Sequence, residues 1–212
     1  MKIGAAAPAL LVVTSAVIRT ATRLPVRFTV TMLCDPGKPM LVLGDDEELA
    51  QFKNNAGVML NGPIVGADIT QWTRMVETNL LGSMYMVHAG LPHLLERRGT
   101  IVQVSSTSGW IASAYAGVYA ATKFGITAFS ESLRQEVTTR GVRVVVIEPG
   151  FVATELTGHN TDPTMRAAAQ NMAASMRTLQ PQDIADAVVY AVTQPEHVAV
   201  NEILIRPTDQ TQ

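Results

Sequence analysis

The chain has 212 residues, of which 47% are hydrophobic and 16% charged, and its formal net charge is −2. This length and composition predict one folded domain over residues 1–212. The low charge and the lack of basic runs argue against a nucleic-acid or membrane partner. The single cysteine, Cys34, excludes an internal disulfide and favours a cytoplasmic location, and the scattered histidines predict no metal site.

The first predicted element is a buried strand over residues 9–14. It lies in an apolar stretch, residues 3–18, that also has the basic and apolar regions of a signal peptide. A β-rich segment predicts a second strand over residues 26–33, and residues 40–43 could form a third. Acidic residues lead the segment 45–53, which indicates a helix.

Beyond residue 54, helical and strand patterns alternate. Asp68 and Gln71 could form a capping box at the start of a long helix that bends or breaks near Pro92. Gly141 ends a second long helix. The predicted helices cover residues 68–97, 114–140, 163–176 and 182–192, and the predicted strands cover residues 100–105, 142–147 and 199–205.

Strands that alternate with helices of ten or more residues predict an α/β fold of the Rossmann-like type. We expect a doubly wound parallel sheet between two layers of helices, with an incomplete N-terminal edge. In such sheets ligands bind at the carboxyl ends of the strands. Ser106 follows one predicted strand and Pro149 ends the next, so both lie at that edge.

Three residues carry the clearest chemical signal: Ser106, Tyr119 and Lys123. Tyr119 and Lys123 are four residues apart and therefore share one face of a helix. A nearby ammonium lowers the pKa of a phenol, which would let Tyr119 exchange a proton near neutral pH. The Ser106 hydroxyl could hydrogen-bond a substrate oxygen. Together these groups suit the interconversion of an alcohol and a carbonyl compound.

From Asn54 onward the chain resembles the short-chain dehydrogenase/reductase family. The similarity is greatest to a bacterial subgroup that includes clavulanic acid dehydrogenase and NADP-dependent 3-hydroxy acid dehydrogenases. It divides the domain into a divergent part, residues 1–53, and a family-like part, residues 54–212. The matching motifs are NNAG (54–57), TNLLG (78–82), VSS (104–106), YAATK (119–123) and PGFVAT (149–154).

The resemblance implies a role for each matched residue. Tyr119 would be the catalytic acid/base, Lys123 would lower its pKa and hold the nicotinamide ribose, and Ser106 would bind the substrate oxygen. Asn79 would hold a water in a proton relay to Lys123. The implied cofactor-binding residues are Asn55, Ala56, Gly57, Tyr119, Lys123, Pro149, Gly150, Val152 and Thr154.

Simpler interpretations exist for several of these residues. Thr154 could cap the next helix, and Asn79 could be an ordinary polar helix residue. Trp110 is most simply a packing residue, although it could border the substrate pocket. Ser105 should point away from Ser106 if the strand period of two persists.

The first 53 residues depart from the family. The glycine-rich phosphate loop that follows the family's first strand is missing, and the only glycine before residue 37 is Gly4. This part could result from a deletion or frame error, could be a divergent dinucleotide-binding half, or could be completed by another segment or subunit. Asp35 would favour NAD as an acidic residue after the second strand, whereas the resembling subgroup uses NADP.

The resemblance thus implies an NAD(P)-dependent oxidoreductase that interconverts a small alcohol and its aldehyde or ketone. The cofactor would be NADP or NAD, and the protein would form a homodimer or homotetramer through its two long helices. The alternative is a non-catalytic dinucleotide-fold protein that serves as a scaffold, because the phosphate loop is missing. The identity of the substrate is not legible in the sequence.

Overall fold

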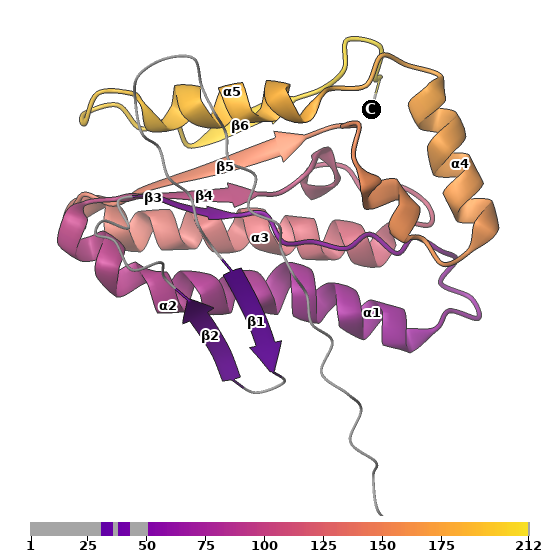
Figure 1. Cartoon of the computed structure of the whole chain (residues 1–212), viewed down its shortest axis with the longest axis horizontal. Coiled ribbons are helices and arrows are strands. Elements are labelled where there is room, and N and C mark those ends of the chain that lie inside the picture. Colours follow the sequence, from indigo (N-terminus) through magenta and orange to yellow (C-terminus); the bar gives the residue numbers. More distant parts are fainter. Residues whose placement is uncertain (1–30, 36–37, 43–50, 212) are drawn as a thin grey trace, which may run out of the picture.

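The computed structural model describes residues 31–35, 38–42 and 51–211, with side chains from Asn54 onward. Its main feature is a parallel sheet of four strands in the order β3-β4-β5-β6, with helices on both faces (Figure 1). This arrangement confirms the predicted Rossmann-like α/β fold. The strands are β3 (Gln51–Asn54), β4 (Thr100–Val104), β5 (Arg143–Pro149) and β6 (Glu202–Ile205).

The helices follow the predicted order, with boundaries that shift by a few residues. Helices α1, α2 and α3 cover one face of the sheet, and α5 covers the other (Figure 1). The helices are α1 (Ile69–Met75), η1 (Val76–Leu81), α2 (Gly82–Arg97), η2 (Thr107–Gly109), α3 (Gly117–Val137), η3 (Thr138–Arg140), η4 (Glu155–His159), α4 (Pro163–Ala174) and α5 (Pro181–Val192).

The two central strands are apolar because both of their faces are covered. Ile101 of β4 and Val144 of β5 are register partners and pack into the core beneath α2 and α3. Their neighbours Val102 and Val145 are also partners and pack on the other face, against α5. The strand period of two thus divides consecutive residues between two separate cores.

The structure corrects the predictions for the first part of the chain. Strands β1 (Thr31–Asp35) and β2 (Lys38–Val42) pair with each other in an antiparallel arrangement instead of joining the parallel sheet. The sequence predicted a helix over residues 45–53, but residues 51–54 form strand β3, which pairs with β4. The polar composition of this segment does not favour a strand, but the neighbouring strand β4 provides its hydrogen-bond partners. The strand predicted over residues 9–14 lies outside the described residues.

The first long helix stays helical through Pro92 to Arg97, so the chain does not break at this proline. Asp68 caps it by accepting a hydrogen bond from the Thr70 backbone N–H. The side-chain amide of Gln71 donates instead to Thr161 Oγ1, at 3.0 Å. Gly141 ends the second long helix with a positive φ of 80°, as predicted.

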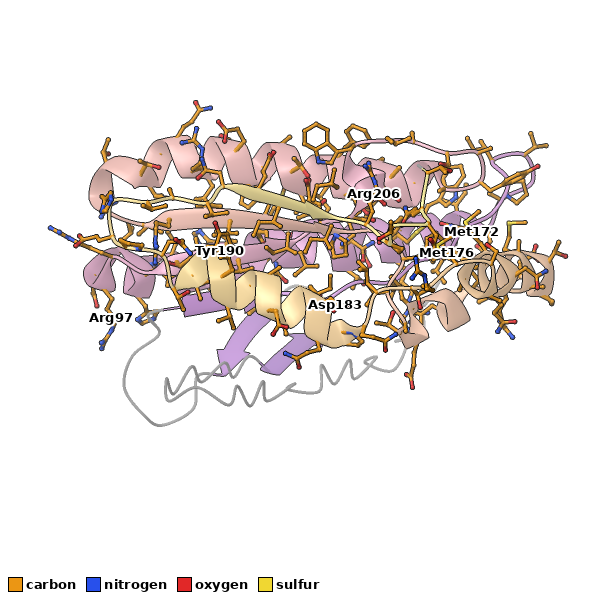
Figure 2. The ribbon with its side chains drawn as sticks, turned by 90° about the horizontal axis from the view of Figure 1, so that it is seen from above. Arg97, Met172, Met176, Asp183, Tyr190 and Arg206 are labelled. Carbon is orange, nitrogen blue, oxygen red and sulfur yellow. The ribbon has the colours of Figure 1, made fainter. Side chains whose placement is uncertain are left out.

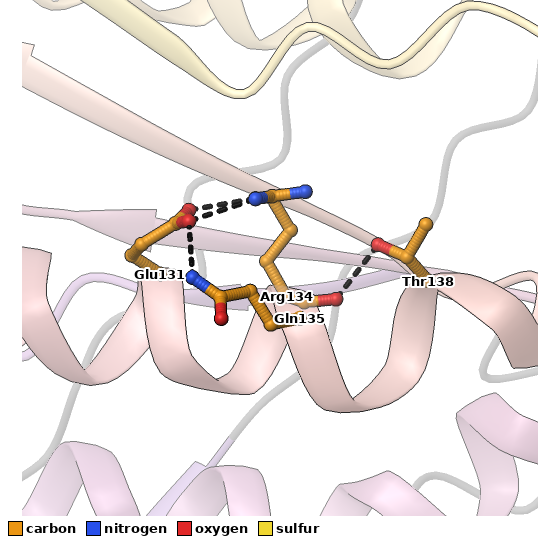
Figure 3. A network of polar contacts seen from close by, with 4 residues as sticks. All are labelled: Glu131, Arg134, Gln135 and Thr138. Carbon is orange, nitrogen blue, oxygen red and sulfur yellow. Dashed lines mark hydrogen bonds and ion pairs between the residues drawn. The ribbon is translucent and has the colours of Figure 1, made fainter.

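The C-terminal half of α3 carries a polar network on its solvent-exposed side (Figure 3). Arg134 donates two hydrogen bonds to the Glu131 carboxylate, at 2.6 and 2.7 Å, and Gln135 donates a third at 2.8 Å. The Thr138 hydroxyl donates to the Arg134 carbonyl at 2.7 Å and so occupies one of the last acceptors of the helix. These contacts belong to a solvated helix face that lies away from the sheet edge.

Over the described residues, no helix is both long and apolar enough to cross a membrane.

Candidate active site

The candidate site lies at the carboxyl ends of the parallel strands. Ser106 follows β4, Pro149 ends β5, and Tyr119 and Lys123 lie in the first two turns of α3, between these strands in the chain. Figure 1 shows η4 and α4 at this same end of the sheet. The fold therefore brings the three residues of the chemical signal to one edge, as the alternating pattern predicts.

Tyr119 and Lys123 are buried, with only 5% and 6% of their surfaces exposed. The Lys123 ammonium donates to the Val104 carbonyl oxygen at 2.9 Å and lies 5.7 Å from the centre of the Tyr119 ring. The Ser106 hydroxyl accepts from the Ser108 N–H at 3.1 Å and donates to the Pro149 carbonyl oxygen at 3.5 Å. It also lies close enough to the Tyr119 hydroxyl to lower the pKa of that phenol.

The pKa values of Tyr119 and Lys123 differ from the prediction that Lys123 lowers the pKa of Tyr119. Burial raises the pKa of Tyr119 to about 12, and the Ser106 hydrogen bond lowers it only in part. Burial also lowers the pKa of Lys123 to about 8. Desolvation of the phenol is the larger influence on the pKa of Tyr119, and the opposing influence comes from Ser106.

Asn79 occupies a π-helical turn, η1, between α1 and α2. Its side-chain oxygen accepts from the Val58 N–H at 2.8 Å, and its amide donates to the Val58 carbonyl at 2.9 Å and to Thr122 Oγ1 at 3.2 Å. Asn79 thus ties the loop after β3 to the turn of α3 between Tyr119 and Lys123. π-Helical turns often mark functional sites.

The NNAG segment follows β3 into the same region. A Cβ atom at Gly57 would lie 3.5 Å from Asn79 Oδ1 and 4.0 Å from Lys123 Nζ, so Gly57 borders both side chains. Asn55 is exposed, and Ala56 packs against the core beneath α2 and α3. Of the three, Gly57 lies nearest the chemical residues.

The segment after β5 begins at the same edge of the sheet. The Gly150 N–H donates to the Ile205 carbonyl at 2.7 Å, which fixes this segment to the end of β6. Val152 packs against the core beneath α5. Thr154 caps η4 by accepting from the Leu156 N–H at 3.4 Å, which is the simpler of its two predicted roles.

Contacts missed in the sequence hold the segment 155–174 against the loop after β3. The Asn61 N–H donates to Asn160 Oδ1 at 2.7 Å, and Arg166 Nη2 donates to the Asn160 carbonyl at 2.6 Å. Met172 and Met176 lie at the end of α4 nearest the sheet (Figure 2). No motif signals these contacts, because Asn61 and Asn160 are 99 residues apart.

A second missed group surrounds Glu148, the residue before Pro149. Its carboxylate accepts hydrogen bonds from Trp110 Nε1 and from Thr127 Oγ1. Ser105 faces this side, as the strand period predicts, and its hydroxyl donates to the Lys123 carbonyl at 3.2 Å. The signal was available in the sequence, because the acidic Glu148 directly follows the apolar run 144–147.

Residues 47–164, more than half of the chain, match the family model described as short chain dehydrogenase, and the protein belongs to this family. The match begins at residue 47, so the family likeness starts before the junction predicted at Lys53/Asn54.

The chain is similar to bacterial relatives over 155 residues. It is 38% identical to an uncharacterized oxidoreductase of Staphylococcus aureus (strain MRSA252), with 73% of this chain and 62% of the relative covered. It is 41% identical to one of Staphylococcus epidermidis, with 73% and 63% covered. The chain thus spans less than two thirds of the length of these relatives.

Solved structures of dehydrogenases share the fold. A closed form of serine dehydrogenase complexed with NADP+ has a TM-score of 0.72 and 34% identity, covering 76% of this chain and 66% of that one. Serine dehydrogenase from Escherichia coli has a TM-score of 0.64 and 33% identity, covering 77% and 66%. An alcohol dehydrogenase from the archaeon Thermococcus sibiricus, complexed with 5-hydroxy-NADP, has a TM-score of 0.66 and 25% identity, covering 76% and 64%.

Proposed function

We propose that the protein is an NAD(P)-dependent oxidoreductase that interconverts a small alcohol and its aldehyde or ketone. The observation that carries this proposal is the grouping of the Ser106 and Tyr119 hydroxyls with the buried Lys123 at the carboxyl edge of the sheet. A carbonyl oxygen placed between these hydroxyls could accept a hydrogen bond from each.

Tyr119 acts as the proton donor in the reductive direction. Its raised pKa keeps the phenol protonated, so the hydroxyl is ready to give its proton to the oxygen of the reduced substrate. Ser106 holds that oxygen. Lys123, with its pKa near 8, can then pass a proton towards the phenolate.

The nicotinamide half of a dinucleotide fits these residues. An ammonium has three N–H donors, and the Lys123 contact with Val104 occupies one, which leaves donors for the ribose hydroxyls. Gly57 leaves room beside Lys123, because a Cβ atom there would take up that space. The bound cofactor supplies or accepts the hydride. NADP is the favoured form, since the solved serine dehydrogenase was complexed with NADP+.

The wall after β5 and the loop after β3 complete the proposed site. Asn79 keeps the loop after β3 against α3 beside Lys123. The proposed cofactor wall consists of Asn55, Ala56, Gly57, Pro149, Gly150, Val152 and Thr154. We also propose a cytoplasmic homodimer or homotetramer that acts on a small-molecule substrate.

We expect Tyr119→Phe to lower turnover by at least about 100-fold, because it removes the donated proton. Oxidation of serine, other 3-hydroxy acids and short-chain alcohols is measured with NADP+ and NAD+. Binding of NADPH and NADH is titrated by nicotinamide fluorescence in parent and variant. The variant should keep the cofactor affinity of the parent within about threefold, since one hydroxyl is lost from a buried ring.

Tyr190→Phe is the matched control, because Tyr190 lies exposed on α5 (Figure 2). It should leave both turnover and cofactor binding unchanged. Tyr119→Phe turnover within threefold of the parent would contradict the acid/base role. A parent that binds neither nucleotide at millimolar concentration would overturn the proposed function.

A further inference from the structure

Glu148 is the least expected buried group at this edge of the sheet. It is the penultimate residue of β5, directly before Pro149 and Gly150, and its surface is 0% exposed. Burying a carboxylate costs free energy, because the group loses its hydration and needs hydrogen-bond partners in the protein instead. Its surroundings therefore deserve a functional explanation.

Two elements donate to the Glu148 carboxylate. Trp110 Nε1 donates to Oε2 from the turn that follows Ser106, and Thr127 Oγ1 donates to Oε1 from α3, at 3.2 Å. Trp110 is otherwise an exposed residue, with 52% of its surface accessible. One side chain thus joins the end of β5 to the Ser106 turn and to α3.

The contacts continue from Thr127 to the chemical residues. Thr127 Oγ1 lies 3.2 Å from Ser105 Oγ, and Ser105 Oγ donates to the Lys123 carbonyl. Gly109 closes over this group, because a Cβ atom there would lie 2.7 Å from Ser105 Oγ and 3.2 Å from the Lys123 carbonyl oxygen. Only a glycine lets the Ser106 turn approach α3 this closely.

The donors match a carboxylate. The Trp110 indole can only donate, and both Glu148 oxygens accept. Burial raises the pKa of Glu148, with a smaller contribution in the same direction from the charge of Glu202 on β6, and the hydrogen bonds from Trp110 and Thr127 offset part of this rise. The hydrogen bond to Glu148 therefore anchors the Trp110 side chain, and the indole N–H loses its acceptor if the carboxylate is removed.

We propose that Glu148 is a positioning residue that, through Trp110, fixes the turn between Ser106 and α3 against the end of β5. The inference rests on the proposed function, because it assigns this turn to the substrate side of that site. A fixed turn keeps Ser106 and the Trp110 ring in one geometry as the substrate binds.

The test compares Glu148→Leu, which removes both acceptors, with Glu148→Gln, which keeps one oxygen for Trp110. The Gln side-chain amide can donate to Thr127 Oγ1, so this variant conserves the anchor while losing the charge. Trp110→Phe removes the donor from an exposed position where the fold is not at risk. The double variant of Glu148→Leu and Trp110→Phe completes a cycle.

Two readouts are measured, and the first needs no activity. Subtracting the Trp110→Phe emission from that of the parent isolates the fluorescence of Trp110. We expect Glu148→Leu to shift this emission to the red and to increase its quenching by acrylamide, while Glu148→Gln stays close to the parent. Emission that does not respond to Glu148→Leu overturns the inference, whether or not the parent turns over.

The second readout is kinetic. Glu148→Leu and Trp110→Phe should each raise the substrate KM about tenfold, with kcat and the Kd of NADPH changed less than threefold. The double variant should be no worse than either single one, and Glu148→Gln should stay within about threefold of the parent. An unchanged KM in Glu148→Leu would overturn the positioning role, and so would an equal rise of KM in Glu148→Gln and Glu148→Leu. Additive effects of Glu148→Leu and Trp110→Phe on KM would also overturn it.

A parent without turnover would contradict the proposed function, and the positioning role of Glu148 in that reaction would fall with it. The emission comparison would still decide whether Glu148 holds Trp110, so the two failures remain distinguishable. If Glu148→Leu does not fold, Trp110→Phe carries the kinetic test alone, and an unchanged KM there overturns the inference.

Discussion

Tyr119 and Lys123 owe their ionisation properties to burial. Burial raises the pKa of the Tyr119 phenol and lowers that of the Lys123 ammonium, because each charged form is poorly solvated there. In the protein without cofactor the phenol therefore keeps its proton, and of these two groups Lys123 titrates nearer to neutral pH. Tyr119 is thus set up as an acid before any ligand arrives.

The titration of Tyr119 tests this assignment. Subtracting the ultraviolet absorbance of Tyr119→Phe from that of the parent isolates its ionisation. The difference should stay flat up to about pH 11, because the pKa is raised to about 12. The folded pKa lies above the ordinary value of 10.0, so the stability contribution of this group is present below pH 10 and lost as the pH rises towards 12.

Circular dichroism at each pH is the control that the parent remains folded during this titration. A phenolate step centred at pH 10 or below in the folded, cofactor-free protein would contradict the assignment. It would show that the Lys123 charge outweighs the desolvation of the phenol, as the spacing of the two residues predicts.

At the scale of elements, the first long helix changes from α-helical to π-helical geometry where it meets the site. The π-helical turn η1 carries Asn79. Its side chain makes two hydrogen bonds with the Val58 backbone in the loop after β3 and one with Thr122 Oγ1. An ordinary α-helical turn would direct this side chain elsewhere, since the angular step between residues differs. The helix therefore positions the loop rather than only covering the sheet.

Asn79→Asp should destabilise the protein by about 1–3 kcal/mol, because it removes the donor to Val58 and Thr122 and buries a charge. Chemical denaturation measures the free energy of unfolding, and hydrogen exchange measures the protection of the Val58 amide. Asn79→Ala should expose that amide, since its acceptor is lost.

Asn201→Asp makes the same chemical change at an exposed position and should leave both quantities unchanged. Full protection of the Val58 amide in Asn79→Ala would contradict the role assigned to this side chain.

At the scale of the whole molecule, apolar rings remain exposed on the two long helices. Tyr85 of α2 and Phe124 of α3 are both exposed, although these helices also pack on the sheet. We expect this surface to pair with another copy of the chain, because exposed aromatic residues favour burial in interfaces. The expectation agrees with the proposed homodimer or homotetramer.

Phe124→Glu should dissociate the oligomer, because it places a charge in the proposed interface. Sedimentation velocity distinguishes the assembly from a single chain. Tyr190→Glu, an equivalent change on the exposed side of α5, should leave the parent's assembly intact. A parent that sediments only as a monomer would contradict the proposal.

The sequence predicted well those features that arise locally. Long amphipathic helices, apolar strands and the glycine at residue 141 follow from periodicity and backbone conformation. It failed where pairing with a distant segment decides the outcome. Strand β3 is polar and short, and its hydrogen bonds come from β4, about 50 residues away.

The same division applies to the candidate site. The spacing of Tyr119 and Lys123 determined that they share a helix face, and the alternation of strands and helices determined that Ser106 and Pro149 reach one edge. Only the tertiary structure decided the pKa values of the site residues and the contacts that hold them in place. Burial sets the pKa of Tyr119 against the trend predicted from Lys123, because desolvation depends on everything packed around the ring. The contacts of Glu148 with Trp110 and Thr127 join residues 38 and 21 positions apart in the sequence, and no local pattern encodes them.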